Sequence, residues 1–232
     1  MPIEVDLNCD MGESFGLYKI GNDEEMMKQV TSANVACGFH AGDPHVMKRT
    51  VSLAKEYGVA VGAHPGYPDP IGFGRRRLEV SPEEAGDYIL YQVGALRAFC
   101  EAAGLEFQHV KPHGQLYNMA WKDEALARGI LQAVRQIKPE PIFLALYNTI
   151  PYEMAQSMGV RVVGELYADL DYAPDGTTFI KKVHGEIDIA STVAKVSRIV
   201  FEGKVTASDG TEIETRGTSV CWRCSLMPSS VR

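Results

Sequence analysis

The sequence predicts an α/β fold, and within that class a single-domain (β/α) barrel. Three observations support this prediction: short apolar segments alternate with longer amphipathic ones, at least six such apolar segments occur, and no linker separates them. Strands that alternate with helices of about 10–15 residues are typical of βαβ units and a parallel sheet. The length of 232 residues suits one large domain. An open doubly wound sheet is the structural alternative.

The predicted strands and helices follow one another along the chain. Strands are expected at residues 3–7, 33–37, 59–63, 107–111, 141–146 and 161–164, with a short closing strand at 217–221. Helices are expected at residues 23–31, 44–57, 82–103, 123–137, 150–158 and 186–201. Asp43 followed by Pro44 is typical of a helix start, and Gly58 of a helix end. Ser81 lies three residues before Glu84, which predicts a capping box.

Composition and charge argue against several classes of protein. Hydrophobic residues make up 45% and charged residues 23% of the chain, which is typical of a folded globular protein. The net charge is −7 and the only basic run is Arg75-Arg76-Arg77, so nucleic acid is not an expected partner. No apolar run approaches ~18 residues, so no membrane association is expected. The N-terminus lacks a signal pattern and the five cysteines are an odd number, which predicts reduced thiols and a cytoplasmic protein.

Side chains with catalytic chemistry follow the predicted strands. Parallel α/β folds bind ligands at the carboxyl ends of their strands. The candidates in these segments are Asn8, Asp10, Glu13, His40, Asp43, His45, His64, Asp69, Lys111, His113, Tyr117, Glu165 and Asp169. Five of the six histidines lie in three of the segments. Imidazoles that converge with carboxylates and a lysine indicate a proton-transfer or metal site.

Some candidate residues have an equally ordinary structural interpretation. Asp43 can be a helix cap, a ligand or both, and the loop that contains Arg75 can bind an anion or be a solvated loop. His45 is expected on the surface or in packing, and His109 in the barrel interior or facing a helix. His184 is expected to be solvated.

Four segments carry a resemblance to a known family. DLNCDMGE at 6–13, SANVACGFHAGD at 32–43, GAHP at 62–65 and HVKPHG at 109–114 strongly resemble the LamB/YcsF family. The resemblance implies a deacetylase-like, seven-stranded β/α barrel. It also implies ATP-dependent 5-oxoprolinase activity, in which 5-oxo-L-proline, ATP and water give L-glutamate, ADP and phosphate, with two partner subunits, B and C. Because the chain has no P-loop motif, ATP chemistry is expected to depend at least partly on those partners.

The implied reaction suggests a role for each candidate. Asp10 or His40 is assigned as the general base, His64 and His113 as acid or electrophile, and Lys111 as the cation that neutralises a phosphate or carboxylate. The residues expected to bind substrate are Asn8, Glu13, Asp43, Arg75, Tyr117 and Asp169.

Two other functions stay open at the level of sequence. The chain can be a metal-dependent hydrolase that acts alone on an amide or acetyl group, with Asp10, His40 and His64 as ligands of a divalent metal such as Zn²⁺. It can also be a non-catalytic barrel that delivers 5-oxoproline to its partners. The oligomeric state is open, a homo-oligomer included.

The chain departs from the family pattern near its end. The family's Ala-Asp-Arg corresponds to Ala168-Asp169-Leu170, and its His-Gly-Asp segment and closing helix have no counterpart after Cys221. We therefore interpret residues 1–221 as the barrel domain and 222–232 as an aberrant tail that a frameshift would explain. The tail, from Trp222 onward, is expected to be poorly packed, disordered or held by a partner chain.

Overall fold

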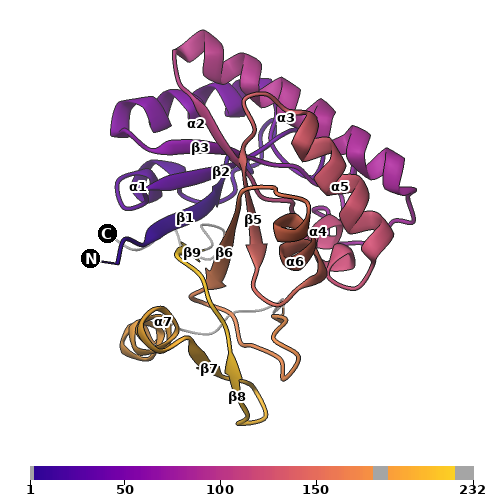
Figure 1. Cartoon of the computed structure of the whole chain (residues 1–232). Helices are drawn as coiled ribbons and strands as arrows, with labels where there is room; N and C mark the ends of the chain where they lie inside the picture. The colour runs from indigo at the N-terminus through magenta and orange to yellow at the C-terminus, as the bar shows by residue number, and fades with distance from the viewer. Residues whose placement is uncertain (1–2, 180–187, 223–232) are drawn as a thin grey trace.

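The computed structural model describes residues 3–179 and 188–222, which contain a closed barrel of seven parallel strands (Figure 1). In barrel order the strands are β1 (Asp6–Met11), β2 (Ser32–Ala36), β3 (Ala60–His64), β4 (Phe107–Val110), β5 (Ile142–Leu146), β6 (Val162–Tyr167) and β9 (Ser219–Cys221). This confirms the predicted single (β/α) barrel with seven strands. The open doubly wound alternative is wrong, because β9 pairs with both β6 and β1 and closes the sheet.

Helices surround the barrel, and a small hairpin lies beside it. The helices are α1 (Asp23–Met27), α2 (Pro44–Tyr57), α3 (Pro82–Ala103), α4 (Gly114–Ala120), α5 (Glu124–Gln136), α6 (Ile150–Ser157) and α7 (Ile189–Glu202). Helices α2, α3 and α5 cover one side of the barrel, whereas α7 lies with the antiparallel pair β7 (Lys204–Thr206) and β8 (Glu212–Glu214) at another side (Figure 1). Within the described residues, no helix combines the length and hydrophobicity needed to cross a membrane.

Local capping explains why some helix bounds match the prediction. The Asp43 side chain accepts hydrogen bonds from the amides of His45 and Val46, and Gly58 ends α2 in the left-handed conformation, with φ of 69°. Ser81 and Glu84 form the predicted capping box of α3. These signals lie within a few residues of the helix ends they determine.

Two strand predictions are wrong in their bounds. The first strand begins at Asp6 instead of residue 3, and its residues Asn8 and Asp10, expected in a loop, lie inside it. Ile3 and Val5 are 52% and 40% exposed, so of the apolar alternation at residues 3–7 Leu7 alone packs against the core. Strand β6 likewise continues past residue 164 and includes Glu165. In both strands, polar side chains that belong to the site resemble loop residues in the sequence.

Smaller differences concern other elements. Helix α1 ends at Met27 instead of residue 31, and neither α4 nor the β7–β8 hairpin is predicted by the sequence pattern. Each of these elements is seven residues or shorter, too short for a clear apolar period.

Barrel closure involves the beginning of the predicted tail. The amide of Trp222 donates a 2.9 Å hydrogen bond to the carbonyl of Asn8, and the partly buried Trp222 ring packs against the core. The expectation of poor packing is therefore wrong for Trp222. Residues 223–232 lie outside the described part of the chain.

The barrel interior is polar and tightly fitted. Asn34 donates to Asn8 Oδ1 at 2.7 Å, Asn8 donates to Ser219 Oγ at 2.8 Å, and His109 Nε2 lies 2.8 Å from Asn34 Oδ1. His109 thus confirms the expected interior position. Its ring occupies the space above Gly62 on the neighbouring strand, where a Cβ would come within 2.1 Å of the imidazole.

We expect Gly62→Ala to destabilise the fold by about 1–3 kcal/mol, because a methyl group overpacks the barrel against His109. Urea denaturation of the isolated chain measures this. Gly94→Ala is the matched control, since Gly94 is an exposed α3 residue where an added Cβ meets nothing within 4 Å. The control is expected to be as stable as the wild type or slightly more so. Equal stability of Gly62→Ala and the wild type would show that the interior accommodates the methyl group.

Candidate active site

The five side chains predicted to be catalytic converge at the carboxyl ends of the strands. Asp10 lies in β1, His64 ends β3, Lys111 follows β4, His40 lies in the loop after β2, and His113 precedes α4. The three histidines and Lys111 are each at most 4% exposed. Their side chains contact one another or Asp10 directly. The predicted convergence on one end of the barrel is confirmed.

Lys111 is the centre of a buried ion-pair cluster. Its Nζ lies 3.0 Å from Asp10 Oδ1, 2.7 Å from Glu165 Oε1 and 2.9 Å from Cys221 Sγ. Burial alone lowers the pKa of this ammonium, but the facing groups Asp10, Cys221 and Glu165 outweigh burial and hold the pKa well above its ordinary value. Burial raises the pKa of Asp10, and the facing His64 and Lys111 side chains bring it well below the usual range. The pair is therefore ionised at neutral pH.

Glu165, expected after the sixth strand but given no role, and Cys221 both belong to this cluster. Glu165 is fully buried in β6, within the otherwise apolar run Val162–Tyr167. A carboxylate in such a run needs a buried partner, and that signal could have assigned Glu165 to the site. Cys221 lies 110 residues from Lys111 and reaches it only because β9 closes the barrel.

His64 and His113 form a pair whose hydrogens are determined by their neighbours. His64 Nδ1 lies 2.7 Å from the carbonyl oxygen of Lys111, and His113 Nε2 lies 2.8 Å from the carbonyl oxygen of Phe73. A carbonyl oxygen only accepts, so each of these nitrogens carries the hydrogen. The remaining nitrogens, His64 Nε2 and His113 Nδ1, face each other at 2.9 Å. When both rings are neutral, each of these two facing nitrogens carries a lone pair.

His40 and Glu13 complete the group of buried ligand-type side chains. The His40 ring stacks on His113 with centroids 3.7 Å apart, and its Nε2 lies 3.8 Å from Glu13 Oε1. Neither His40 nitrogen has a hydrogen-bond partner among the described residues. Burial holds the pKa values of His40 and His113 well below their ordinary value. Burial, assisted by the charge of Asp10, raises the pKa of Glu13 to about 7.

Of the other residues predicted to bind substrate, some line a cavity at the site and others only stabilise the surrounding strands and helices. Arg75 and Tyr117 line a cavity of about 50 Å³ together with His64, Lys111 and His113. Asn8 is bonded to neighbouring strands inside the barrel, and the Asp43 carboxylate accepts three backbone amides at the start of α2. Asp169 is partly buried two residues beyond β6 and does not line this cavity.

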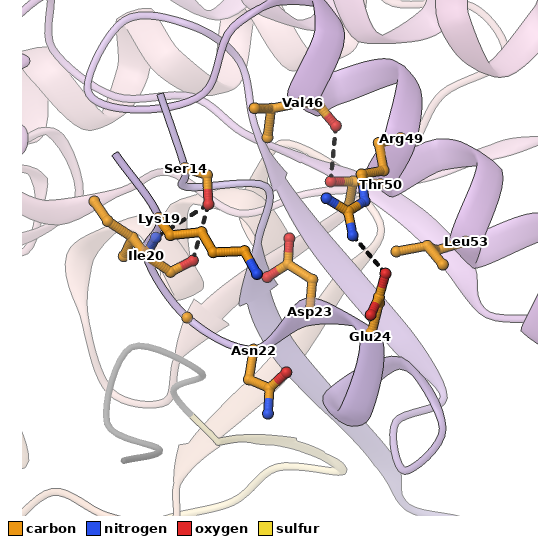
Figure 2. Close-up of a pocket in the computed structure, with 11 residues that line it drawn as sticks. Ser14, Lys19, Ile20, Asn22, Asp23, Glu24, Val46, Arg49, Thr50 and Leu53 are labelled. Carbon is orange, nitrogen blue, oxygen red and sulfur yellow. Dashed lines mark hydrogen bonds and ion pairs between the residues drawn. The ribbon is translucent and has the colours of Figure 1, made fainter. Parts of the chain in front are cut away.

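A second pocket, of about 80 Å³, is formed without the predicted site residues (Figure 2). It lies between the segment around Ser14 and Ile20 and helix α2. Its polar groups largely satisfy one another: Ser14 Oγ accepts from the amide of Ile20, and Arg49 pairs with Glu24. This pocket lacks the buried, reactive side chains found at the carboxyl ends of the barrel strands, which form the barrel mouth.

Comparisons with known proteins agree on one family. The family model described as the LamB/YcsF family matches residues 5–224. The 5-oxoprolinase A subunit of Thermococcus onnurineus (strain NA1) is 53% identical over 94% of this chain and 87% of its own length. That of Clostridium beijerinckii is 49% identical, over 94% and 86%. The crystal structure of a lactam utilization protein from Thermus thermophilus has a TM-score of 0.89 and 44% identity, covering 95% of this chain and 90% of the other.

Proposed function

This chain belongs to the LamB/YcsF family, and on that basis we propose that it acts as the A subunit of a 5-oxoprolinase, opening the lactam ring of 5-oxo-L-proline to give L-glutamate. The observation that carries the proposal is the identity of about half of all residues with relatives that are named as 5-oxoprolinase A subunits, across nearly the whole chain. An A subunit implies a complex of several subunits. We propose subunits B and C as the partners.

The chemistry of a lactam explains why we include ATP as a co-substrate. An amide is stabilised by resonance and is a poor electrophile. Phosphorylation of the amide oxygen by ATP, with ADP as the leaving group, gives an electrophilic imidate. Water adds to its carbon, and protonation of the ring nitrogen lets the C–N bond break, which opens the ring and leaves an acyl phosphate. A second water hydrolyses that acyl phosphate to L-glutamate and phosphate. Because the chain contains no P-loop motif, we propose that nucleotide binding depends at least partly on the partner subunits.

Within this reaction we propose that Lys111 and Arg75 stabilise negative charge. Lys111 is a buried ammonium and Arg75 lines the same cavity, so both suit a substrate carboxylate or a phosphorylated oxygen. Asp10 is a weak base because its pKa is held low, and we assign it to orienting Lys111. The nitrogen lone pairs of His40, His64 and His113 are then the remaining donors at the site, available to a proton or to a cation.

The decisive assay is glutamate release by the reconstituted three-subunit mixture, with and without this chain. We expect release to require 5-oxoproline, ATP and this chain together, and to fall to background when any one is omitted. Glutamate release by the other subunits alone would refute a role for this chain. Hydrolysis of 5-oxoproline or of an acetylated compound by this chain alone, without ATP, would support an independent hydrolase instead.

A further inference from the structure

We propose that Glu13, His40, His64 and His113 bind one divalent transition-metal ion at the barrel mouth, with Zn²⁺ the best match to the donor set. One ligand atom from each side chain lies within 4.8 Å of the other three. The proposal goes beyond the proposed function, because it requires neither ATP, nor 5-oxoproline, nor a partner subunit.

The hydrogen positions of two histidines leave their inner nitrogens available for a cation. His64 Nδ1 and His113 Nε2 donate to backbone carbonyls, so His64 Nε2 and His113 Nδ1 face each other at 2.9 Å as lone pairs when both rings are neutral. Two facing lone pairs repel unless a positive centre lies between or beside them. A metal ion satisfies both nitrogens at once.

The same carbonyls accept the hydrogen bonds that hold metal-binding histidines in place. A ligating imidazole almost always donates its other N–H to a carboxylate, a backbone carbonyl or water, which fixes the ring orientation and the tautomer. The carbonyls of Lys111 and Phe73 do this for His64 and His113. The loop that carries Phe73 is packed tightly on the rings, since a Cβ at Gly74 would come within 2.8 Å of His40 Cβ.

His40 gives an independent indication, because it is buried without a hydrogen-bond partner. It is 1% exposed, and neither ring nitrogen finds a hydrogen-bond partner among the described residues. A buried polar group left unsatisfied is destabilising, so such groups usually have a ligand or a catalytic role. Its Nδ1 lies against Gly66, where a Cβ would come within 2.5 Å, whereas Nε2 faces Glu13 Oε1 at 3.8 Å. Nε2 is therefore the nitrogen that joins the group.

Distances and donor types select the class of metal. Zinc bonds of about 2.0–2.1 Å in tetrahedral geometry place ligand atoms ~3.3 Å apart. The His64–His113 separation of 2.9 Å and the His40–Glu13 separation of 3.8 Å lie on either side of that value. Imidazole nitrogen with one carboxylate oxygen favours Zn²⁺, Co²⁺ or a neighbouring ion over Mg²⁺ or Ca²⁺, which prefer oxygen ligands only.

The proposed ligands differ from the set Asp10, His40 and His64 suggested by the sequence. Asp10 Oδ1 is paired with Lys111 at 3.0 Å, and Asp10 Oδ2 lies 3.4 Å from His64 Nε2. We therefore place Asp10 beside the metal, as a neighbouring negative charge, and assign Glu13 as the carboxylate ligand. A metal here would supply Lewis acidity to a bound water or carbonyl oxygen.

The test measures metal binding by the isolated chain after dialysis against a chelator. Co²⁺ titration followed by visible absorption, and Zn²⁺ titration followed by calorimetry, are expected to show one ion per chain. Glu13→Gln, which keeps the side-chain size, and His113→Ala are each expected to weaken binding at least ~100-fold. His45→Ala is the matched control, because His45 is an exposed α2 histidine, and it is expected to bind like the wild type.

Thermal unfolding provides the folding control and a second measurement. Added metal is expected to raise the Tm of the depleted wild type and of His45→Ala, but not of Glu13→Gln, because only the native site binds it. Absence of binding by folded wild-type chain, or equal binding by Glu13→Gln and wild type, would overturn the metal site. Since no substrate or partner is present, a failure of the proposed 5-oxoprolinase activity would leave this result unchanged.

Discussion

Replacement of Lys111 by methionine is expected to lower ATP-dependent glutamate release by the reconstituted complex at least ~100-fold, the usual scale for losing a catalytic charge. Methionine keeps most of the side-chain length but removes the ammonium that contacts both Asp10 and Glu165. The change therefore leaves two carboxylates at the barrel mouth without the cation that they share. Initial rates at saturating 5-oxoproline and ATP measure the effect.

The folding of the Lys111→Met variant must be checked, because Asp10 and Glu165 both lose their counter-ion. Breaking a buried pair by removing one partner costs about 3–5 kcal/mol. The double variant Lys111→Met with Glu165→Gln removes one charge of each sign and is expected to recover much of that loss, but not the activity. Glu165→Gln alone separates its own contribution, and Lys122→Met, at an exposed lysine, is the matched control. Turnover near the wild-type rate by a folded Lys111→Met chain would contradict the proposed role.

Replacement of His40 by alanine is the second change expected to have a large effect, again at least ~100-fold on turnover. The His40 nitrogens make no hydrogen bond among the described residues, so the fold does not depend on its polar atoms. The variant loses ring stacking on His113 but also the cost of an unsatisfied buried imidazole. We therefore expect it to fold, as circular dichroism and urea denaturation will show.

The control for this experiment is His45→Ala, which is expected to retain wild-type turnover because His45 is exposed at the start of α2. Full activity of a folded His40→Ala complex would show that the buried imidazole is structural. Loss of activity in both histidine variants would indicate that the assay responds to general damage to the α2 region.

Local signals in the sequence were sufficient for several elements. The start of α2 at Asp43 and Pro44, and its end at Gly58, depend on backbone hydrogen bonds within a few residues. The same holds for the capping box of Ser81 and Glu84. The bounds of β1 and β6 could not be read locally, because their polar residues are stabilised by partners on other strands.

The sequence by itself determined that the chain is a parallel α/β fold and that His40, His64, Lys111 and His113 gather at one end, since parallel strands bring their carboxyl ends to the same edge. Only the tertiary structure decided that the sheet closes into a barrel and which atoms face one another. Barrel closure through β9 places Cys221 next to Lys111. Backbone carbonyls from distant residues determine which nitrogen of His64 and of His113 carries the hydrogen. Hydrogen bonds and ion pairs depend on separations of a few ångströms between residues far apart in the chain, and strand order and closure, rather than local pattern, determine those separations.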